Sequence, residues 1–351
     1  MTSSQTDYSE HELLESHRYA EPLYAGGIRC HGGFDDDGRY VSPRTVHRVP
    51  AIESWEEVRA EAFGTPQLDI PLDRWPPTVP NVAQAKFLIA NGVPGPIIST
   101  LTRIGTVEGF GGFIRTLPLP DLSRCFDEDV RGTAMAHLER GLYEAHARDE
   151  AGFEDEGGHK DMWFAARDIA FEHPVDDDDV LEMLQRMGFS RPGSASATPP
   201  PPRVLPDDLD ADLEGVIEFM ARLLLIEISA FHTFAWAEEV LSDNDLVAGD
   251  GEAARLVSYI RSDETPHVSY LKTTLSEMRD RTFLGSSGKR YPGTEMVGRI
   301  WDRAVADSLG ARREANVKLA LGEVEHALDG HPGRADLLAE FHSLATPEVA
   351  A

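Results

Sequence analysis

Glu227 is a carboxylate within an otherwise apolar helical pattern. Across the segment 208–242, apolar side chains recur at helical spacing on both sides of Glu227. The stripe consists of Met220, Leu223, Leu224, Phe231, Phe234 and Leu241. A carboxylate is costly to bury unless it is paired, protonated or bound to a metal ion. The stripe therefore predicts a buried carboxylate that has a chemical partner.

The segment 250–281 carries a second polar interruption of the same kind. Glu264 and His267 are three residues apart, so both side chains lie on one helix face within an apolar stripe. If the two segments form an antiparallel hairpin, Glu227 and Glu264 lie at one height, about 22 Å from the turn. Carboxylate oxygen with imidazole nitrogen suits iron or manganese, and four-helix bundles combine two such halves around two ions. These two helices thus predict half of a dinuclear site.

A matching string lies in the first half of the chain. Residues 155–159 read Asp-Glu-Gly-Gly-His, and residues 263–267 read Asp-Glu-Thr-Pro-His. One copy per half is the pattern of a duplicated bundle site. Glu156 and His159 are therefore predicted as the ligand pair of the first half.

On these motifs the chain resembles the ferritin-like di-iron carboxylate superfamily, roughly over residues 95–282. That group holds ribonucleotide reductase small subunits, multicomponent monooxygenase hydroxylases and arylamine N-oxygenases. The resemblance implies an all-α, ferritin-like four-helix bundle with an extra turn-rich N-terminal segment and C-terminal helices. It also implies that the Asp before each Glu orients a ligand imidazole. The implied ligands are Glu227, Glu264, His267, Glu156 and His159.

The first helical half needs one more carboxylate ligand, and the sequence offers two candidates for it, Glu108 and Glu144. Glu108 continues an apolar stripe, yet it lies about 20 residues, or roughly 30 Å, out of register with Glu156 if the following helix is unbroken. Either that helix breaks near Gly152 and the glycines at 157–158, or the ligands differ. Pro266 in the second string predicts a kink or a helix start.

Glu139, Glu144 and His146 fit the expected height better than Glu108 does. Glu139 and His146 are two helical turns apart on one face, which is compatible with the haem-oxygenase-like di-iron oxidases. That fold usually offers a second histidine one turn before its last carboxylate, where this chain has Ile260. It remains the alternative topology.

The resemblance implies a non-haem di-iron, or Mn/Fe, carboxylate oxidase or oxygenase that uses O₂ on a small organic substrate. Hydroxylation and N-oxygenation are both open. Two Fe ions are the implied cofactor, with Mn as the alternative. An electron-donor protein and a homodimer are the partners left open. The alternative function is a non-enzymatic ferritin-like metal-binding or helical interaction protein.

The amino-acid composition indicates which partners the protein can bind and in which compartment it is found. The chain has 61 acidic and 33 basic residues and a formal charge of −28, which argues against nucleic acid and anionic membrane as partners. Two distant cysteines exclude a disulfide framework and favour a reducing compartment. No secretory signal and no long apolar segment is visible, so a cytoplasmic protein is expected.

The pattern predicts five regions: a turn-rich segment 1–78 with a hairpin or ordered loop at 30–40, a helical half 79–190, a Pro/Ser-rich linker 191–207, a second helical half 208–282 and a helical cover 283–351. The expected helices are 81–91, 95–117, 127–151, 156–172, 178–187, 208–242, 250–281, 293–312, 313–328 and 333–345.

Overall fold

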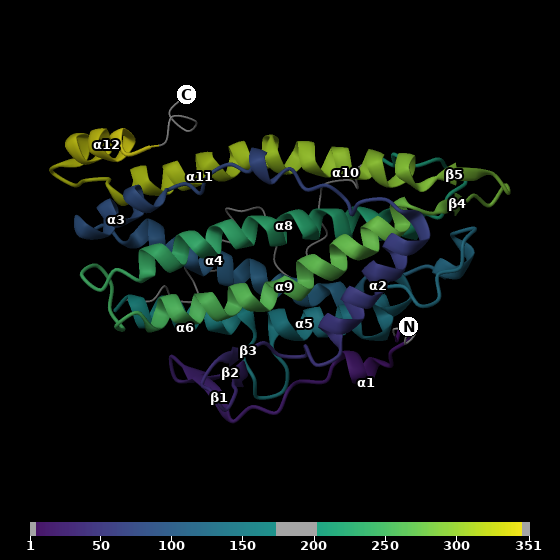
Figure 1. The fold of residues 1–351 in the computed structure, drawn as a ribbon. Coiled ribbons are helices and arrows are strands. Elements are labelled where there is room, and N and C mark those ends of the chain that lie inside the picture. The colour runs from purple at the N-terminus through teal and green to yellow at the C-terminus, as the bar shows by residue number, and fades with distance from the viewer. Residues whose placement is uncertain (1–4, 173–201, 346–351) are drawn as a thin grey trace.

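The computed structural model describes residues 5–172 and 202–345, and this part of the chain is mostly helical (Figure 1). The helical class is thus confirmed, although two small sheets accompany the helices. The expected helix 178–187 and most of the expected linker lie outside the described residues. No helix in the described ranges is long and apolar enough to cross a membrane.

Five helices surround the centre of the molecule: α4 (Gly95–Gly111), α5 (Tyr143–Ala151), α6 (His159–Ala170), α8 (Ala211–Leu241) and α9 (Glu252–Arg279). The long helices α8 and α9 pack along each other as a hairpin (Figure 1). Helix α6 packs against both α4 and α9, while α5 contacts α4 and α6. Only the loop 152–158 separates α5 from α6, and the two helices follow one another end to end along one side of the α8–α9 hairpin (Figure 1).

The ends of α8 and α9 follow from local chemistry. Asp210 caps α8 by accepting hydrogen bonds from the backbone N–H groups of residues 212 and 213. Gly251 precedes α9 with a φ of 76°, a left-handed conformation that glycine adopts without steric cost. Helix α9 continues through Pro266 to Arg279, so the proline does not start a new helix.

The apolar core is divided into two parts along α8 and α9. One part includes Met220 and Leu224 of α8 with Leu271 of α9, and the other includes Phe234 of α8 with Ile260 of α9. Glu227 of α8 and Glu264 and His267 of α9, all buried, lie along the helices at the boundary between these two parts. The structure therefore keeps apolar side chains on both sides of this boundary.

The N-terminal segment forms a three-stranded antiparallel sheet of β1 (Glu21–Ala25), β2 (Ile28–Phe34) and β3 (Tyr40–Val41). The connection between β2 and β3 confirms the hairpin expected at 30–40. The N–H of His31 donates to the carbonyl of Gly157, and the N–H of Gly157 donates to the carbonyl of Arg29. These bonds hold β2 against the loop between α5 and α6.

The remaining elements cover the central helices. Helix α10 packs on α8 and α9, and α11 packs on α4 (Figure 1). The elements not yet bounded are α1 (Glu10–Leu13), α2 (Arg48–Phe63), α3 (Val82–Ala90), β4 (Thr282–Leu284), β5 (Arg290–Pro292), α10 (Gly293–Leu309), α11 (Ala311–Ala327) and α12 (Arg334–Ser343).

Candidate metal centre

Seven side chains with metal-ligand chemistry meet at the boundary between the two core parts. They are four glutamates and three histidines, and each is at most 9% exposed. They come from all five central helices: Glu108 on α4, His146 and Glu150 on α5, His159 on α6, Glu227 on α8, and Glu264 and His267 on α9. We refer to these seven residues as the buried cluster.

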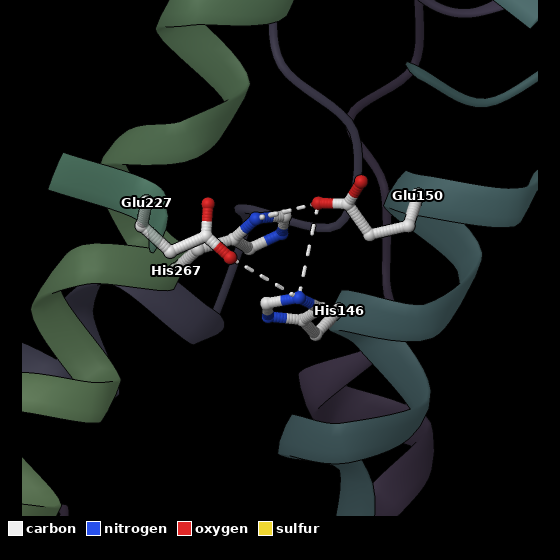
Figure 2. A group of neighbouring side chains, drawn as sticks. All are labelled: His146, Glu150, Glu227 and His267. Atoms are coloured by element: carbon white, nitrogen blue, oxygen red, sulfur yellow. Dashed lines mark ion pairs between the residues drawn. The ribbon is translucent and has the colours of Figure 1, made fainter. Parts of the chain in front are cut away.

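One half of the cluster is the group His146, Glu150, Glu227 and His267, whose side chains point toward one another from α5, α8 and α9 (Figure 2). The Nε2 atom of His146 lies 3.5 Å from Glu227 Oε1 and 3.8 Å from Glu150 Oε1. The Nδ1 atom of His267 lies 3.3 Å from Glu150 Oε1. Two imidazole nitrogens and two carboxylates thus converge on one point.

The other half is the group Glu108, Glu150, His159 and Glu264. The Nδ1 atom of His159 lies 2.9 Å from Glu264 Oε1, 3.3 Å from Glu150 Oε1 and 3.6 Å from Glu108 Oε2. Glu150 belongs to both groups, so one carboxylate lies between them. A shared carboxylate is the arrangement that places two metal ions close together.

Several donor atoms of the cluster are buried without a hydrogen-bond partner. They include both carboxylate oxygens of Glu150, Nε2 of His146, Nδ1 of His159 and Oε1 of Glu264. Buried polar atoms are nearly always satisfied, and each unsatisfied one is costly. Oε1 of Glu150, Nε2 of His146, Nδ1 of His159 and Oε1 of Glu264 lie within the two groups, so the residues present fit metal ions, which would accept their lone pairs.

The raised pKa values of two cluster glutamates also indicate that the site favours a positive charge. Burial raises the pKa of Glu227 well above its ordinary value, and the neighbouring Glu264 and Glu150 raise it further. Burial and the nearby Glu150 act on the pKa of Glu108 in the same way. Carboxylates held this close together repel one another unless a cation or a proton separates them.

The surrounding groups shift the pKa values of the three cluster histidines in different directions. Burial lowers the pKa of His146 to about 3, and His267 beside it acts in the same direction, so His146 is neutral and able to ligate. Burial alone would lower the pKa of His159 and His267, but Glu264 and other carboxylates raise both well above the ordinary value. Protons on these two histidines therefore balance part of the carboxylate charge, and a bound metal ion would displace them.

Two buried aspartates lie on the far sides of the cluster histidines His267 and His159. Asp149 Oδ2 lies 2.9 Å from His267 Nε2. Asp263 Oδ2 lies 3.6 Å from His159 Nε2 and accepts a 2.7 Å hydrogen bond from the Tyr40 hydroxyl. A carboxylate that accepts the second N–H of an imidazole fixes its tautomer and leaves the other nitrogen free to ligate. Each aspartate directly precedes a cluster glutamate. Asp149 makes this hydrogen bond to His267 of another helix, whereas Asp263 approaches Nε2 of His159 without a hydrogen bond.

A third group of metal-type residues, His31, His159 and Asp263, adjoins the cluster. His31 Nε2 lies 3.0 Å from Asp263 Oδ2, and its Nδ1 lies 3.4 Å from Arg44 Nη2. Both nitrogens of His31 are therefore occupied by hydrogen bonds. We interpret His31 as a neighbour of Asp263 rather than as a ligand.

The structure places most of the sequence-predicted ligands together. Glu108, His159, Glu227, Glu264 and His267 all lie in the buried cluster. The expected register mismatch of Glu108 does not arise, because the expected helix 127–151 becomes α-helical only at Tyr143.

Two expected ligands, Glu144 and Glu156, lie outside the cluster, which corrects the expected ligand set. Glu144 Oε1 pairs with Arg148 at 2.7 Å, because a residue two positions before His146 points about 200° away around the helix. Glu156 Oε1 pairs with Arg29 at 2.9 Å. Since Glu156 lies in the loop before α6, it shares no helix face with His159.

Glu150 is not among the residues predicted from the sequence, and His146 is predicted to fit the expected height without being placed among the expected ligands. The missed signal is the string 146–150, His-Ala-Arg-Asp-Glu, which places His146 and Glu150 one turn apart on α5. Asp149 and Glu150 occupy the same roles as Asp263 and Glu264: in each pair the aspartate lies beside a cluster histidine, and the glutamate belongs to the cluster. The Asp-Glu pair at 155–156 resembles these pairs only in letters.

Comparisons with protein-family models, with curated proteins and with solved structures gave no match to this chain.

Proposed function

We propose that the protein is a non-haem dinuclear metal oxidase or oxygenase that uses O₂ on a small organic substrate. The observation that carries this proposal is Glu150, whose carboxylate is shared by two groups of four buried donors. Iron is the proposed metal, with manganese as the alternative, because the donors are carboxylate oxygens and imidazole nitrogens. Glu108, Glu150, His159 and Glu264 would hold one ion, and His146, Glu150, Glu227 and His267 the other.

Charge balance supports two divalent ions rather than one. Six buried carboxylates surround the centre, namely the four cluster glutamates with Asp149 and Asp263. Arg44 and Arg48 compensate two of these negative charges, since both guanidinium groups bind Asp149. Four negative charges remain when the histidines are neutral, and two divalent cations would neutralise them. Buried charge without compensation is strongly unfavourable.

We further propose that the fold is a ferritin-like bundle in which α5 and α6 together take the place of one helix. Supporting this are the α8–α9 hairpin, the packing of α6 against α4 and α9, and ligands contributed by every one of these helices. In such bundles the ligands project inward from facing helices, as the cluster residues do here.

Bound and reduced iron would supply the electrons that activate O₂. The chain's own contribution is to hold the ligands in place and to exclude water. Asp149 holds the proton of His267 on Nε2, which leaves Nδ1 directed at Glu150 and Glu264. The divided apolar core lies on both sides of the cluster and keeps the centre dry.

Substrate access is proposed at the side of the cluster formed by α4 and α8. Glu108 and Glu227 are 9% and 4% exposed, whereas the other five members are at most 2% exposed. A small organic molecule that approaches from this side would meet the carboxylates rather than the histidines. Hydroxylation and N-oxygenation both remain within this proposal.

The test begins with the purified protein, freed of metal and loaded anaerobically with Fe(II). Two iron ions per chain by elemental analysis, followed by ferric charge-transfer absorption on exposure to O₂, would support the dinuclear centre. With a chemical reductant added to return the metal to Fe(II), consumption of O₂ in excess of the iron, together with oxidation of a small amine or hydrocarbon, would support the enzyme. Two ions with O₂ uptake limited to the iron present would favour metal storage, and no bound iron would refute both.

A further inference from the structure

Arg44 is a buried arginine in a strained backbone conformation beside the buried cluster. It lies between β3 and α2, is 4% exposed, and has a φ of 53°. A side chain larger than glycine rarely adopts this left-handed conformation, and such residues persist where the surrounding structure requires them. The backbone N–H of Arg44 is held by Ser16 Oγ at 2.9 Å.

The guanidinium group of Arg44 contacts Asp149 directly. Its Nε donates to Asp149 Oδ1 at 2.7 Å, while Arg48 Nη1 donates to Asp149 Oδ2 at 2.7 Å. The same Oδ2 atom lies 2.9 Å from His267 Nε2. Two arginines thus fix the carboxylate that orients His267, and the carboxylate has no freedom to turn away.

Arg44 also reaches the other half of the cluster. A guanidinium group only donates, so Nδ1 of His31, 3.4 Å from Arg44 Nη2, must be the acceptor. His31 therefore carries its proton on Nε2 and donates to Asp263 Oδ2 at 3.0 Å. Asp263 in turn lies beside Nε2 of His159. One side chain of the N-terminal segment is thus connected to the aspartates of both halves.

We propose that Arg44, assisted by Arg48, is a positioning residue of the dinuclear centre, so that the N-terminal segment is an essential part of the metal site. This inference rests on the proposed function in that it requires the cluster to bind metal. Removal of the guanidinium group frees Asp149 and His31 together. The orientation of His267 is then no longer enforced, Asp263 is no longer held beside His159, and metal affinity falls.

A matched control variant at Arg59 shows whether Arg44 positions the metal site or only stabilises the fold. Arg59 lies on α2, the helix that begins at Arg48, and it is 2% exposed. It pairs with Glu56 of the same helix and with Asp280, which follows the end of α9, 13 residues beyond His267. Arg59→Gln removes a buried ion pair of the same kind without a path to the ligand histidines.

The experiment is a titration of the metal-free full chain with Co(II), whose visible absorption reports on the ligand geometry. Wild type is expected to bind two Co(II) ions. Arg44→Gln is expected to weaken binding at least about tenfold and to change the absorption spectrum. Arg44→Lys should recover part of the affinity, and Arg59→Gln should retain wild-type affinity and spectrum even if its melting temperature falls.

Unchanged Co(II) affinity and spectrum in folded Arg44→Gln would overturn the inference while leaving the metal site intact. Failure of wild type to bind Co(II) or iron would instead refute the proposed function itself. If Arg44→Gln does not fold, Arg44→Gly and Arg48→Gln replace it, because glycine tolerates the left-handed backbone and Arg48→Gln leaves Arg44 in place. Wild-type affinity in both of these variants would also overturn the inference.

Discussion

The Oε1 atom of Glu150 lies 3.3 Å from His159 Nδ1, although Glu150 lies in the last turn of α5 and His159 begins α6. In the C-terminal part of the chain, Glu264 and His267 meet within a single turn of α9, with Oε2 of Glu264 2.6 Å from Nδ1 of His267. The same pairing is thus made by helical spacing in one half and by a loop in the other. A Cβ at Gly158 would lie 2.3 Å from the backbone nitrogen of Gly152, so the loop closes tightly only with glycine there.

The first prediction concerns the shared carboxylate. Glu150→Gln should weaken metal binding at both groups, at least about tenfold at each, because Glu150 belongs to both. The matched control is Glu156→Gln, which changes a partly exposed residue paired with Arg29. Metal content of the two variants, measured by elemental analysis after Fe(II) loading, should differ sharply. Equal losses in both variants would restore Glu156 as a ligand.

The second prediction concerns the histidine on α5. His146→Gln should remove the ion held with Glu227 and retain the other, because His146 belongs to only one group. About one ion per chain is therefore expected in place of two. Glu144→Gln, two residues away on the outer face and paired with Arg148, should keep both ions. An unchanged stoichiometry in His146→Gln would show that this imidazole is not a ligand.

The third prediction concerns stability with and without metal. Glu227→Gln should stabilise the metal-free protein by about 1 kcal/mol or more, because it removes a buried carboxylate that Glu264 and Glu150 repel. With metal bound the order should reverse, since binding to the native state stabilises wild type by about 4 kcal/mol at a thousand times Kd. Urea unfolding with chelator and with Fe(II) measures both. If the order is the same in both conditions, Glu227 does not hold metal.

The fourth prediction concerns pH and lies away from the cluster. Burial raises the pKa of Glu277 from 4.5 to about 7, against the lowering effect of backbone N–H groups at Met135 and Ala134. Between these values the folded state binds a proton that the unfolded state has lost. Stability from this group is therefore complete below pH 4.5 and falls by roughly 3 kcal/mol as the pH rises through 7.

The check compares the pH dependence of the free energy of unfolding in wild type and in Glu277→Gln. The difference between the two should fall as the pH rises from 5 to about 7.5, because glutamine does not titrate. Contributions of the buried cluster cancel in this comparison, since Glu277 bonds to the backbone of residues 134 and 135 instead. A constant difference over this range would place the pKa of Glu277 near its ordinary value.

The sequence alone determined those features of the fold and of the candidate site that depend on helical spacing. Apolar stripes interrupted by Glu227 and by Glu264 with His267 predicted two amphipathic helices with a polar centre, and α8 and α9 place these residues together. This was possible because positions three and four apart share a helix face wherever the helix lies. Helix positions across the C-terminal region were predictable for the same reason.

Only the tertiary structure decided which residues of segment 79–190 join the buried cluster, and how the N-terminal segment contributes to it. The letters at 155–159 matched the motif, but the chain leaves α5 after Ala151 and resumes helix at His159, so spacing there carried no information about a shared face. Glu150 meets His267, and Arg44 meets Asp149, through packing between segments far apart in the chain. Such contacts depend on how helices and strands are placed against one another, which local periodicity does not encode.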